Sequence, residues 1–132
     1  MMNDLMIGLT ATAETKAAPE NSAQSVGSGS LEVFATPAMI ALMEKAAAAS
    51  VQPRLEHGQT TVGTLLNVSH VAATPLGMQV TAKAELVAMD NRKLTFKVEA
   101  FDEKGKIGEG IHERFIINIE KFMGRVNGKR KR

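Results

Sequence analysis

Three side chains of this 132-residue chain combine the groups that attack an acyl carbon. Thr36 offers a hydroxyl, Glu44 a carboxylate and His70 an imidazole. A hydroxyl, a base beside it and a charged group that orients the base are the set needed for general-base or nucleophilic chemistry on a carbonyl. The set alone is unspecific, because these residue types occur together in most proteins.

Each of the three also has an ordinary structural interpretation. Thr36 precedes Pro37, and threonine before proline commonly starts a helix, with its hydroxyl capping the first turn. Glu44 adjoins Lys45, so both could share one exposed stripe. If Glu44 were instead buried, its charge would require a partner or a shifted pKa. His70 has apolar neighbours, so alone it is most simply a hydrogen-bonded core histidine.

The remaining histidines and one arginine indicate no catalytic site of their own. His112 and Arg114 alternate with Glu113 and therefore share a face of one segment. We expect a solvated or salt-bridged sheet face there, or else a contact with a partner subunit or CoA. His57 lies in a Glu-His-Gly turn and is interpreted as an exposed loop residue. The three histidines show no ligand spacing, so no metal site is predicted.

Composition narrows the classes of function. The chain contains no cysteine, which excludes disulfides, thiolate metal sites and cysteine nucleophiles. It contains no tryptophan or tyrosine, so platforms for stacking nucleic-acid bases are scarce. No apolar run approaches the length of a membrane helix, and the start MMNDLMIGLT lacks the basic segment of a signal peptide. We expect a cytoplasmic protein that binds neither nucleic acid nor membrane.

Charge is unevenly distributed along the chain. All 14 acids precede residue 125, and the other 11 of the 16 bases give residues 1–124 a net charge of −3. The last eight residues hold five bases, namely Arg125, Lys129, Arg130, Lys131 and Arg132. We expect a single domain over residues 1–124 and a flexible basic tail over residues 125–132, either solvated or helping to hold an anion such as a nucleotide phosphate.

Hydrophobic periodicity predicts the elements that must position these residues. Residues 5–16 favour a strand, and the stretch PENSAQSVGSGS favours a loop beside a pocket. Residues 37–50 predict a helix that is apolar nearly all round and therefore buried. Alternating segments joined by short turns then predict four consecutive antiparallel strands, at residues 60–73, 79–89, 94–100 and 107–119.

A helix without a polar face and a sheet with one apolar face bury each other. The predicted fold class is therefore α+β, with one long buried helix wrapped by a curved antiparallel sheet. An edge strand of such a sheet is satisfied when it pairs with its twin across a two-fold axis. We therefore expect a homodimer.

The sequence around the three polar residues is more specific than the residues themselves. The segments ATPAMIALME, VGTLLNVSHVAATP and HERFIIN resemble, in order and spacing, the fluoroacetyl-CoA thioesterase-like family of hotdog-fold proteins. The resemblance spans about residues 31–123. It implies a hotdog fold and an acyl-CoA thioesterase that hydrolyses a small or medium acyl-CoA thioester to free acid and CoA. CoA is then part of the substrate, and no separate cofactor is implied.

By the same resemblance, the family's catalytic residues fall on Thr36, Glu44 and His70, and its oxyanion-side glycine falls on Gly63. His70 would act as the base and Thr36 as nucleophile or positioning hydroxyl. Glu44 would be the charge partner of the histidine, or the group that activates water or attacks the carbonyl. The absent side chain of Gly63 would let a thioester carbonyl approach a backbone N–H, although a bulge or close packing is its structural alternative. In hotdog proteins the pocket usually lies where two protomers meet, so the residues need not serve one site from one chain.

The resemblance leaves the acyl group and two other classes open. The segment SVGSGSLEVF is small and flexible and lacks an aromatic gate, so a range of acyl groups broader than fluoroacetyl is expected. A non-catalytic acyl-CoA-binding hotdog module need not keep the three polar residues, and a hotdog hydratase would place its acid and base differently. The KRKR tail alone indicates nucleic-acid binding, which the acidic body opposes.

Overall fold

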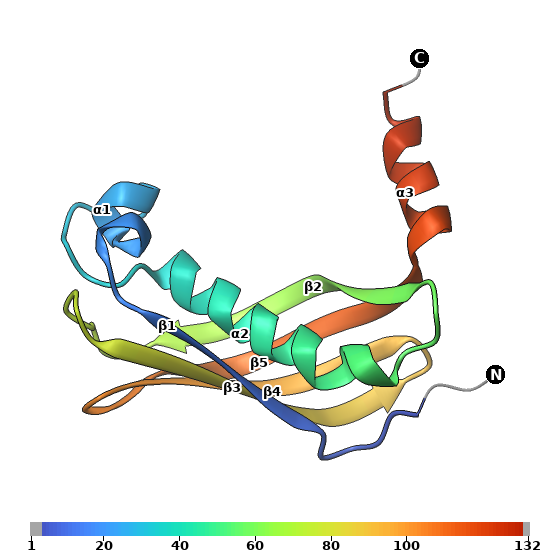
Figure 1. Ribbon diagram of the computed structural model, residues 1–132, viewed down its shortest axis with the longest axis horizontal. Helices are drawn as coiled ribbons and strands as arrows, with labels where there is room; N and C mark the ends of the chain where they lie inside the picture. Colours follow the sequence, from blue (N-terminus) through green and yellow to red (C-terminus); the bar gives the residue numbers. More distant parts are fainter. Residues whose placement is uncertain (1–3, 131–132) are drawn as a thin grey trace.

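The computed structural model describes residues 4–130 and contains one long helix packed against a five-stranded antiparallel sheet (Figure 1). The helix, α2, spans Thr36–Val51 and is extended by a 3₁₀ turn over Gln52–Arg54. The strands are β1 (Thr10–Lys16), β2 (Gln59–His70), β3 (Gln79–Asp90), β4 (Lys93–Asp102) and β5 (Gly105–Asn118). The predicted α+β hotdog fold is confirmed.

The start of α2 differs from the sequence expectation in one respect that matters for the site. Ala35 is the N-cap residue, Thr36 is already helical, and Pro37 lies in the first turn. No side chain caps this end of the helix. Thr36 was expected to use its hydroxyl as a cap, but the hydroxyl contacts a strand instead, because helical backbone angles turn it away from the free N–H groups.

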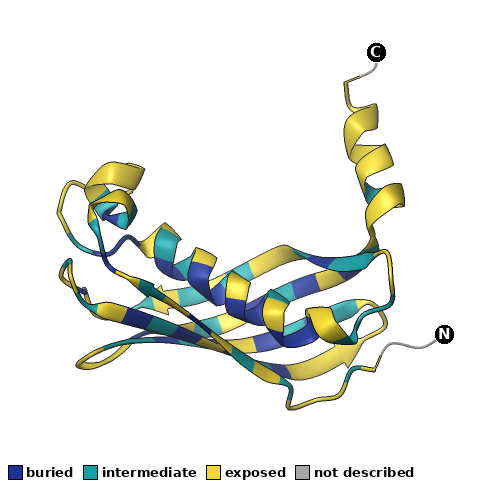
Figure 2. Cartoon of the chain, in the orientation of Figure 1, coloured by how far each residue is buried: buried dark blue, intermediate teal, exposed yellow. Residues whose placement is uncertain are grey.

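The core lies between one face of α2 and the sheet, as the dark residues of Figure 2 show. Met39, Met43 and Ala46 are fully buried against sheet residues that include Leu86 and Phe96. Burial of each large apolar side chain contributes about 1.5–3 kcal/mol. The predicted buried helix is thus confirmed for the face that meets the sheet, while the opposite face, with Ala41, Lys45 and Ala49, is exposed. Small alanines on that face made the helix look uniformly apolar.

The strand order is β1-β3-β4-β5-β2. The three C-terminal strands form the predicted antiparallel meander. Strand β2 pairs with β5 and not with its chain neighbour β3, so the expectation of four strands in consecutive order was wrong. Residues 71–78 make a connection long enough to carry the chain across the sheet, where a tight turn would have forced adjacent pairing.

A β-bulge in β2 determines which of its side chains face the helix. The register against β5 shifts between Gly63 and Leu65. In a regular strand, residues seven positions apart point to opposite faces. Because the bulge adds one residue, Gly63 and His70 both face α2.

Short helices occur where the sequence predicted loop or tail. The stretch PENSAQSVGSGS contains a 3₁₀ turn, Pro19–Asn21, and the single-turn helix α1, Ala23–Val26, whose start is capped by Ser22. After β5, helix α3 spans Ile119–Gly128, and the Asn118 side chain accepts a hydrogen bond from the Lys121 N–H. The helix thus reaches into the expected tail over residues 125–132, of which residues 131 and 132 lie outside the described part. Within residues 4–130, no helix is both long and apolar enough to cross a membrane.

Candidate active site

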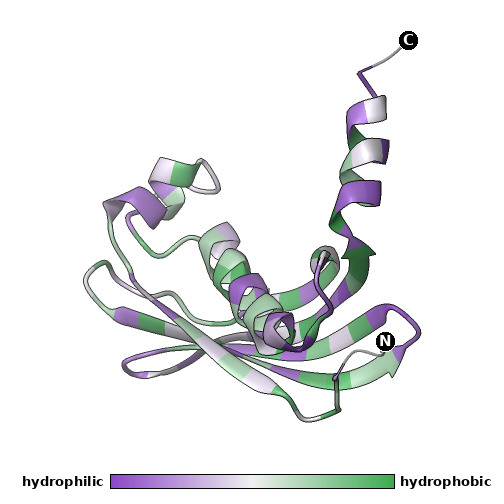
Figure 3. Cartoon of the chain, turned by 45° about the vertical axis from the view of Figure 1, so that its right-hand side comes forward, coloured by the Kyte–Doolittle hydropathy of each residue, from purple (hydrophilic) through white to green (hydrophobic). Residues whose placement is uncertain are grey.

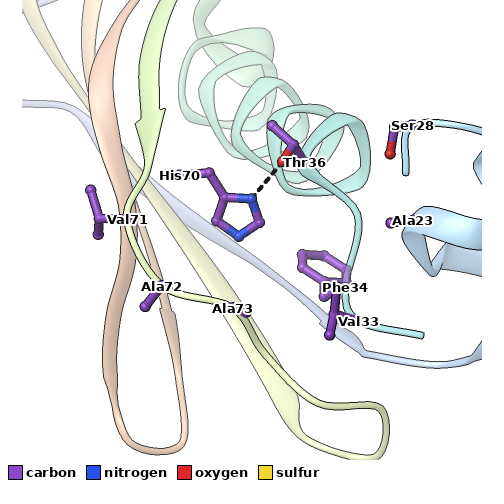
Figure 4. Close-up of a pocket in the computed structure, with 9 residues that line it drawn as sticks. All are labelled: Ala23, Ser28, Val33, Phe34, Thr36, His70, Val71, Ala72 and Ala73. Atoms are coloured by element: carbon purple, nitrogen blue, oxygen red, sulfur yellow. Dashed lines mark hydrogen bonds between the residues drawn. The ribbon is translucent and has the colours of Figure 1, made fainter. Parts of the chain in front are cut away.

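Thr36 and His70 meet where α2 begins and β2 ends. The Thr36 Oγ1 lies 2.6 Å from the His70 Nδ1 (Figure 4). This distance is that of a strong hydrogen bond between a hydroxyl and a ring nitrogen. A hydroxyl held against an imidazole can transfer its proton as it attacks a carbonyl.

The second ring nitrogen of His70 is buried and unpaired. His70 Nε2 has no hydrogen-bond partner among residues 4–130. Burial lowers the pKa of His70 below its usual value, and the backbone of Ala72 acts in the opposite direction. The imidazole is therefore neutral near pH 7, the state in which it can accept a proton.

The pair lies in a cavity of about 280 Å³. Apart from Thr36 and His70, its lining is small or apolar: Ala23, Ser28, Val33, Phe34, Val71, Ala72 and Ala73. Phe34 is almost fully buried and also lines a second cavity of about 240 Å³ beside α2, so its ring forms a wall between the two. The first cavity holds a hydroxyl, a base and room for a small apolar group.

Glu44 belongs to a different cluster, formed with Gly63, His112 and Arg114 near the middle of α2. The Glu44 Oε2 lies 3.8 Å from the Arg114 Nη1. A Cβ added at Gly63 would lie 2.6 Å from the same carboxylate oxygen and 3.2 Å from the His112 Cε1. Glycine at this position therefore leaves the space that the carboxylate occupies.

His112 and Arg114 are buried, so the face is not solvated, but the alternative of a salt-bridged face fits Arg114, which lies 3.8 Å from the Glu44 carboxylate. His112 is 0% exposed and Arg114 is 8% exposed. Arg114 donates from Nε to the Thr61 hydroxyl and from Nη2 to the Thr61 carbonyl, at 2.8 Å and 2.9 Å. His112 Nδ1 lies 2.9 Å from the Leu65 carbonyl oxygen. These hydrogen bonds satisfy polar groups that burial would otherwise penalise.

Burial dominates the protonation of this cluster. It lowers the pKa of His112, against the hydrogen bond to Leu65, while the Arg114 charge lowers it further and the Glu44 charge raises it. Burial also lowers the pKa of Arg114, and the Glu44 charge opposes this. His112 is therefore neutral at pH 7, while a guanidinium stays charged throughout the physiological range.

The structure thus brings the four predicted site residues together in two pairs. Thr36 and Glu44 are eight residues apart on one helix, or about 12 Å along its axis. Gly63 and His70 are separated by roughly 20 Å along β2. Thr36 lies with His70, and Glu44 lies with Gly63, at two separate places on one protomer.

Alternation along β5 could not identify its inward face. The inward face of β5 carries His112, Arg114 and Ile116. The other face carries the apolar residues Ile111 and Phe115. Both faces of the strand therefore look like a core face in the sequence. The predicted loop residue His57 lines a separate cavity beside the start of α3.

The class of the protein follows from this fold and site. A long helix on a five-stranded antiparallel sheet, with a hydroxyl and an imidazole paired at the helix start, defines a hotdog-fold thioesterase. A hotdog-like protein from Thermanaerovibrio acidaminovorans shares the fold, with a TM-score of 0.85 at 22% identity over 93% of this chain and 91% of that one.

Sequence comparison assigns the family. The model of the family FlK, fluoroacetyl-CoA-specific thioesterase, matches residues 17–120. Over 98 residues the chain is 46% identical to the fluoroacetyl-CoA thioesterase of Streptantibioticus cattleyicolor, covering 74% of this chain and 70% of the relative. A solved structure of the fluoroacetyl-CoA thioesterase FlK matches with a TM-score of 0.89 at 36% identity, over 96% of this chain and 98% of that one.

The chain belongs to the fluoroacetyl-CoA-specific thioesterase family. It is a thioester hydrolase that acts on acyl-CoA, which confirms that prediction over the binding module and the hydratase. Structures of FlK variants contain fluoroacetate with CoA in one case and acetyl-CoA in another.

Proposed function

We propose that the protein hydrolyses short acyl-CoA thioesters at the Thr36–His70 pair. The observation that carries this proposal is the 2.6 Å contact between Thr36 Oγ1 and His70 Nδ1 inside a cavity. As Oγ1 attacks the thioester carbonyl, Nδ1 accepts the hydroxyl proton and passes it to the departing CoA thiolate. Water then hydrolyses the acyl-threonine, again with His70 as the base.

The cavity supports a short acyl group. Its volume of about 280 Å³ and its small apolar lining leave space for a few carbon atoms beyond the carbonyl. The wall formed by Phe34 limits the chain length. Fluoroacetyl-CoA is one candidate substrate by family membership, and because Phe34 is the only aromatic residue of SVGSGSLEVF, other short acyl groups are candidates as well. We keep the cytoplasm as the predicted compartment, because acyl-CoA is an intracellular metabolite.

The second cluster joins this site when two protomers pair. β2 is an outermost strand of 12 residues, and no strand among residues 4–130 lies on its outer edge. Such an edge can pair with its twin in antiparallel orientation, which would abolish two unpaired edges. If the two-fold axis passes through Asn67, Gly63 of each chain stands opposite His70 of the other, because the bulge between Gly63 and Leu65 shortens that side of the strand by one residue. The proposed dimer then supplies Glu44 and Gly63 to the partner's Thr36–His70 pair.

Removal of either member of the pair tests the hydrolase proposal. Thr36→Ala and His70→Ala should each reduce kcat for thiol release from fluoroacetyl-CoA by about 10²- to 10⁴-fold, the usual contribution of a positioned base or nucleophile. Thr12→Ala, an exposed threonine of β1 at the far edge of the sheet, is the matched control and should leave kcat unchanged. Activity of folded His70→Ala within about twofold of the unmodified enzyme would refute the assignment.

A further inference from the structure

Helix α3 has no role in the protomer's own core. None of its residues is buried, and it extends away from the sheet on the side of β2 (Figure 1). Its apolar residues Ile119, Met123 and Val126 are 44%, 43% and 41% exposed. They recur at the spacing of one helix face, so α3 presents an unpartnered apolar stripe (Figure 3).

Helix α3 and the two residues that follow it carry four positive charges without an ion pair in the described part of the chain. Lys121, Arg125, Lys129 and Arg130 form no ion pair with any residue in the described range 4–130. Glu120 is the only acid after β5. The helix is therefore both apolar on one side and cationic.

The thioester cavity lacks what α3 offers. No lysine or arginine of the described residues lines it, although CoA brings a diphosphate and a 3′-phosphate next to any bound thioester. Two lysines of the same protomer, Lys104 and Lys106, line a neighbouring cavity that shares Ala72 and Ala73. One of them, Lys106, is held by Glu99 at 2.9 Å and Glu109 at 2.8 Å, so its charge is largely compensated.

The proposed dimer brings the two features together. With Gly63 opposite the partner's His70, Gln59 lies four residues further along the strand, about 13 Å beyond that histidine. Asn118 pairs with Gln59, and α3 begins at the next residue. It therefore emerges beside the partner's residues 71–73, which line the cavity and include Val71, an apolar residue that is 57% exposed.

We propose that α3 docks on a second copy of this chain, across the mouth of that copy's thioester cavity, and that its cations bind the phosphates of CoA there. The apolar stripe packs against the exposed apolar residues around the cavity, and Lys121, Arg125, Lys129 and Arg130 face the nucleotide end of the substrate. This inference rests on the proposed dimer and extends it. Each active site then takes its base from one chain and its phosphate-binding residues from the other.

A charge-neutralised helix tests the phosphate contact. The variant K121Q/R125Q/K129Q/R130Q should raise KM for fluoroacetyl-CoA at least about tenfold and leave kcat nearly unchanged, because phosphate binding is uniform in ground state and transition state. KM for fluoroacetyl-pantetheine, which has no phosphate, should not change. The control K16Q/K83Q/K97Q removes three exposed charges from β1, β3 and β4 and should leave both KM values unchanged.

Mixed dimers test whether α3 acts on the partner. Co-expression of the neutralised-helix chain with a His70→Ala chain produces heterodimers. In each heterodimer the one intact Thr36–His70 pair lies on the neutralised-helix chain, and the unmodified α3 lies on the other chain. The intact pair therefore meets an unmodified α3 only if the helix acts on the partner chain. These heterodimers should show the KM of the unmodified enzyme. A raised KM in the heterodimers would overturn the proposal, as would an unchanged KM in the neutralised homodimer or an equal rise with fluoroacetyl-pantetheine. If the unmodified enzyme releases no thiol from either substrate, the proposed function itself fails.

Discussion

The burial of a single imidazole determines the protonation state of the Thr36–His70 pair. Water cannot solvate a charge on the inner side of the ring, since Nε2 is buried. The neutral form is therefore favoured, and the pKa of His70 is lowered. A base with a pKa below the working pH is fully available for proton transfer at neutral pH.

This shift predicts the pH profile of the enzyme. Values of kcat/KM should rise with pH through an apparent pKa below 6.5 and reach a plateau by neutral pH, because only the neutral imidazole accepts the Thr36 proton. The stability that His70 contributes has the same sign: it is present above the unfolded pKa of about 6.5 and is lost as pH falls through the lower folded pKa. Initial rates between pH 4.5 and 8 measure the profile, and a midpoint above 6.5 would contradict this account.

The sequence predicted which residues belong to the site but not which of them lie together in one protomer. The hydroxyl and the imidazole lie together because helix α2 starts beside the end of β2, which the motif spacing implied. Their separation from Glu44 follows from the rise of one helix, so it could have been anticipated. The burial of Arg114 could not, because both faces of β5 mix apolar with polar residues and the bulge in β2 has no clear sequence signal.

At the scale of elements, the position of His70 depends on close contact between β2 and β5. A Cβ added at Gly110 would lie 2.6 Å from the Val68 Cα and would also meet the Asn67 carbonyl oxygen. Both obstacles are backbone atoms, which no side-chain rotation can move. Only glycine therefore permits this strand spacing opposite Val68, two residues before His70.

Gly110→Ala should consequently lower stability and activity together. Insertion of a methyl group against backbone costs about 1–3 kcal/mol, and the displaced end of β2 carries His70 away from Thr36. Gly124→Ala in α3 is the matched control: its Cβ meets no atom within 4 Å, and alanine in a helix is favoured over glycine by about 0.5–1 kcal/mol. Thermal unfolding of both variants measures the difference in Tm. Equal Tm changes would show that the close contact between β2 and β5 does not determine stability at this position.

Element types were largely predictable, while the order of the strands was not. Clean alternation identified β3 and β4, and proline after Thr36 marked the start of the helix to within a residue. Pairing of β2 with β5 depends on contacts between residues far apart in sequence, such as Val62 with Phe115, which local patterns do not encode. Likewise, residues 125–128 of α3 were predicted as part of a flexible tail because the last eight residues are rich in bases.

At the scale of the whole molecule, one protomer holds the parts of the site at two separate places. Glu44 and Gly63 lie too far from Thr36 and His70 to act on the same carbonyl. A pairing of β2 with its twin offers one arrangement that unites them, and it also covers the free edge. Residues 1–124 carry a net charge of −3 and therefore do not attract the phosphates of CoA as a whole. In the proposed dimer, the cations of the partner's α3 supply that attraction.

Complementation between two inactive chains distinguishes a shared site from two independent ones. Glu44→Ala and His70→Ala homodimers should each be nearly inactive. In a heterodimer, the chain with Glu44→Ala keeps His70 and receives Glu44 from its partner, so one of the two sites is complete. Random assortment makes half of all dimers heterodimers, and activity should recover to about a quarter of that of the unmodified enzyme. If Glu44 acted within its own chain, no site in the mixture would be complete and no activity would return. Thiol release by purified, doubly tagged heterodimers therefore decides between the two arrangements. Their activity should reach about half of that of the unmodified enzyme, because one of the two sites in each heterodimer is complete.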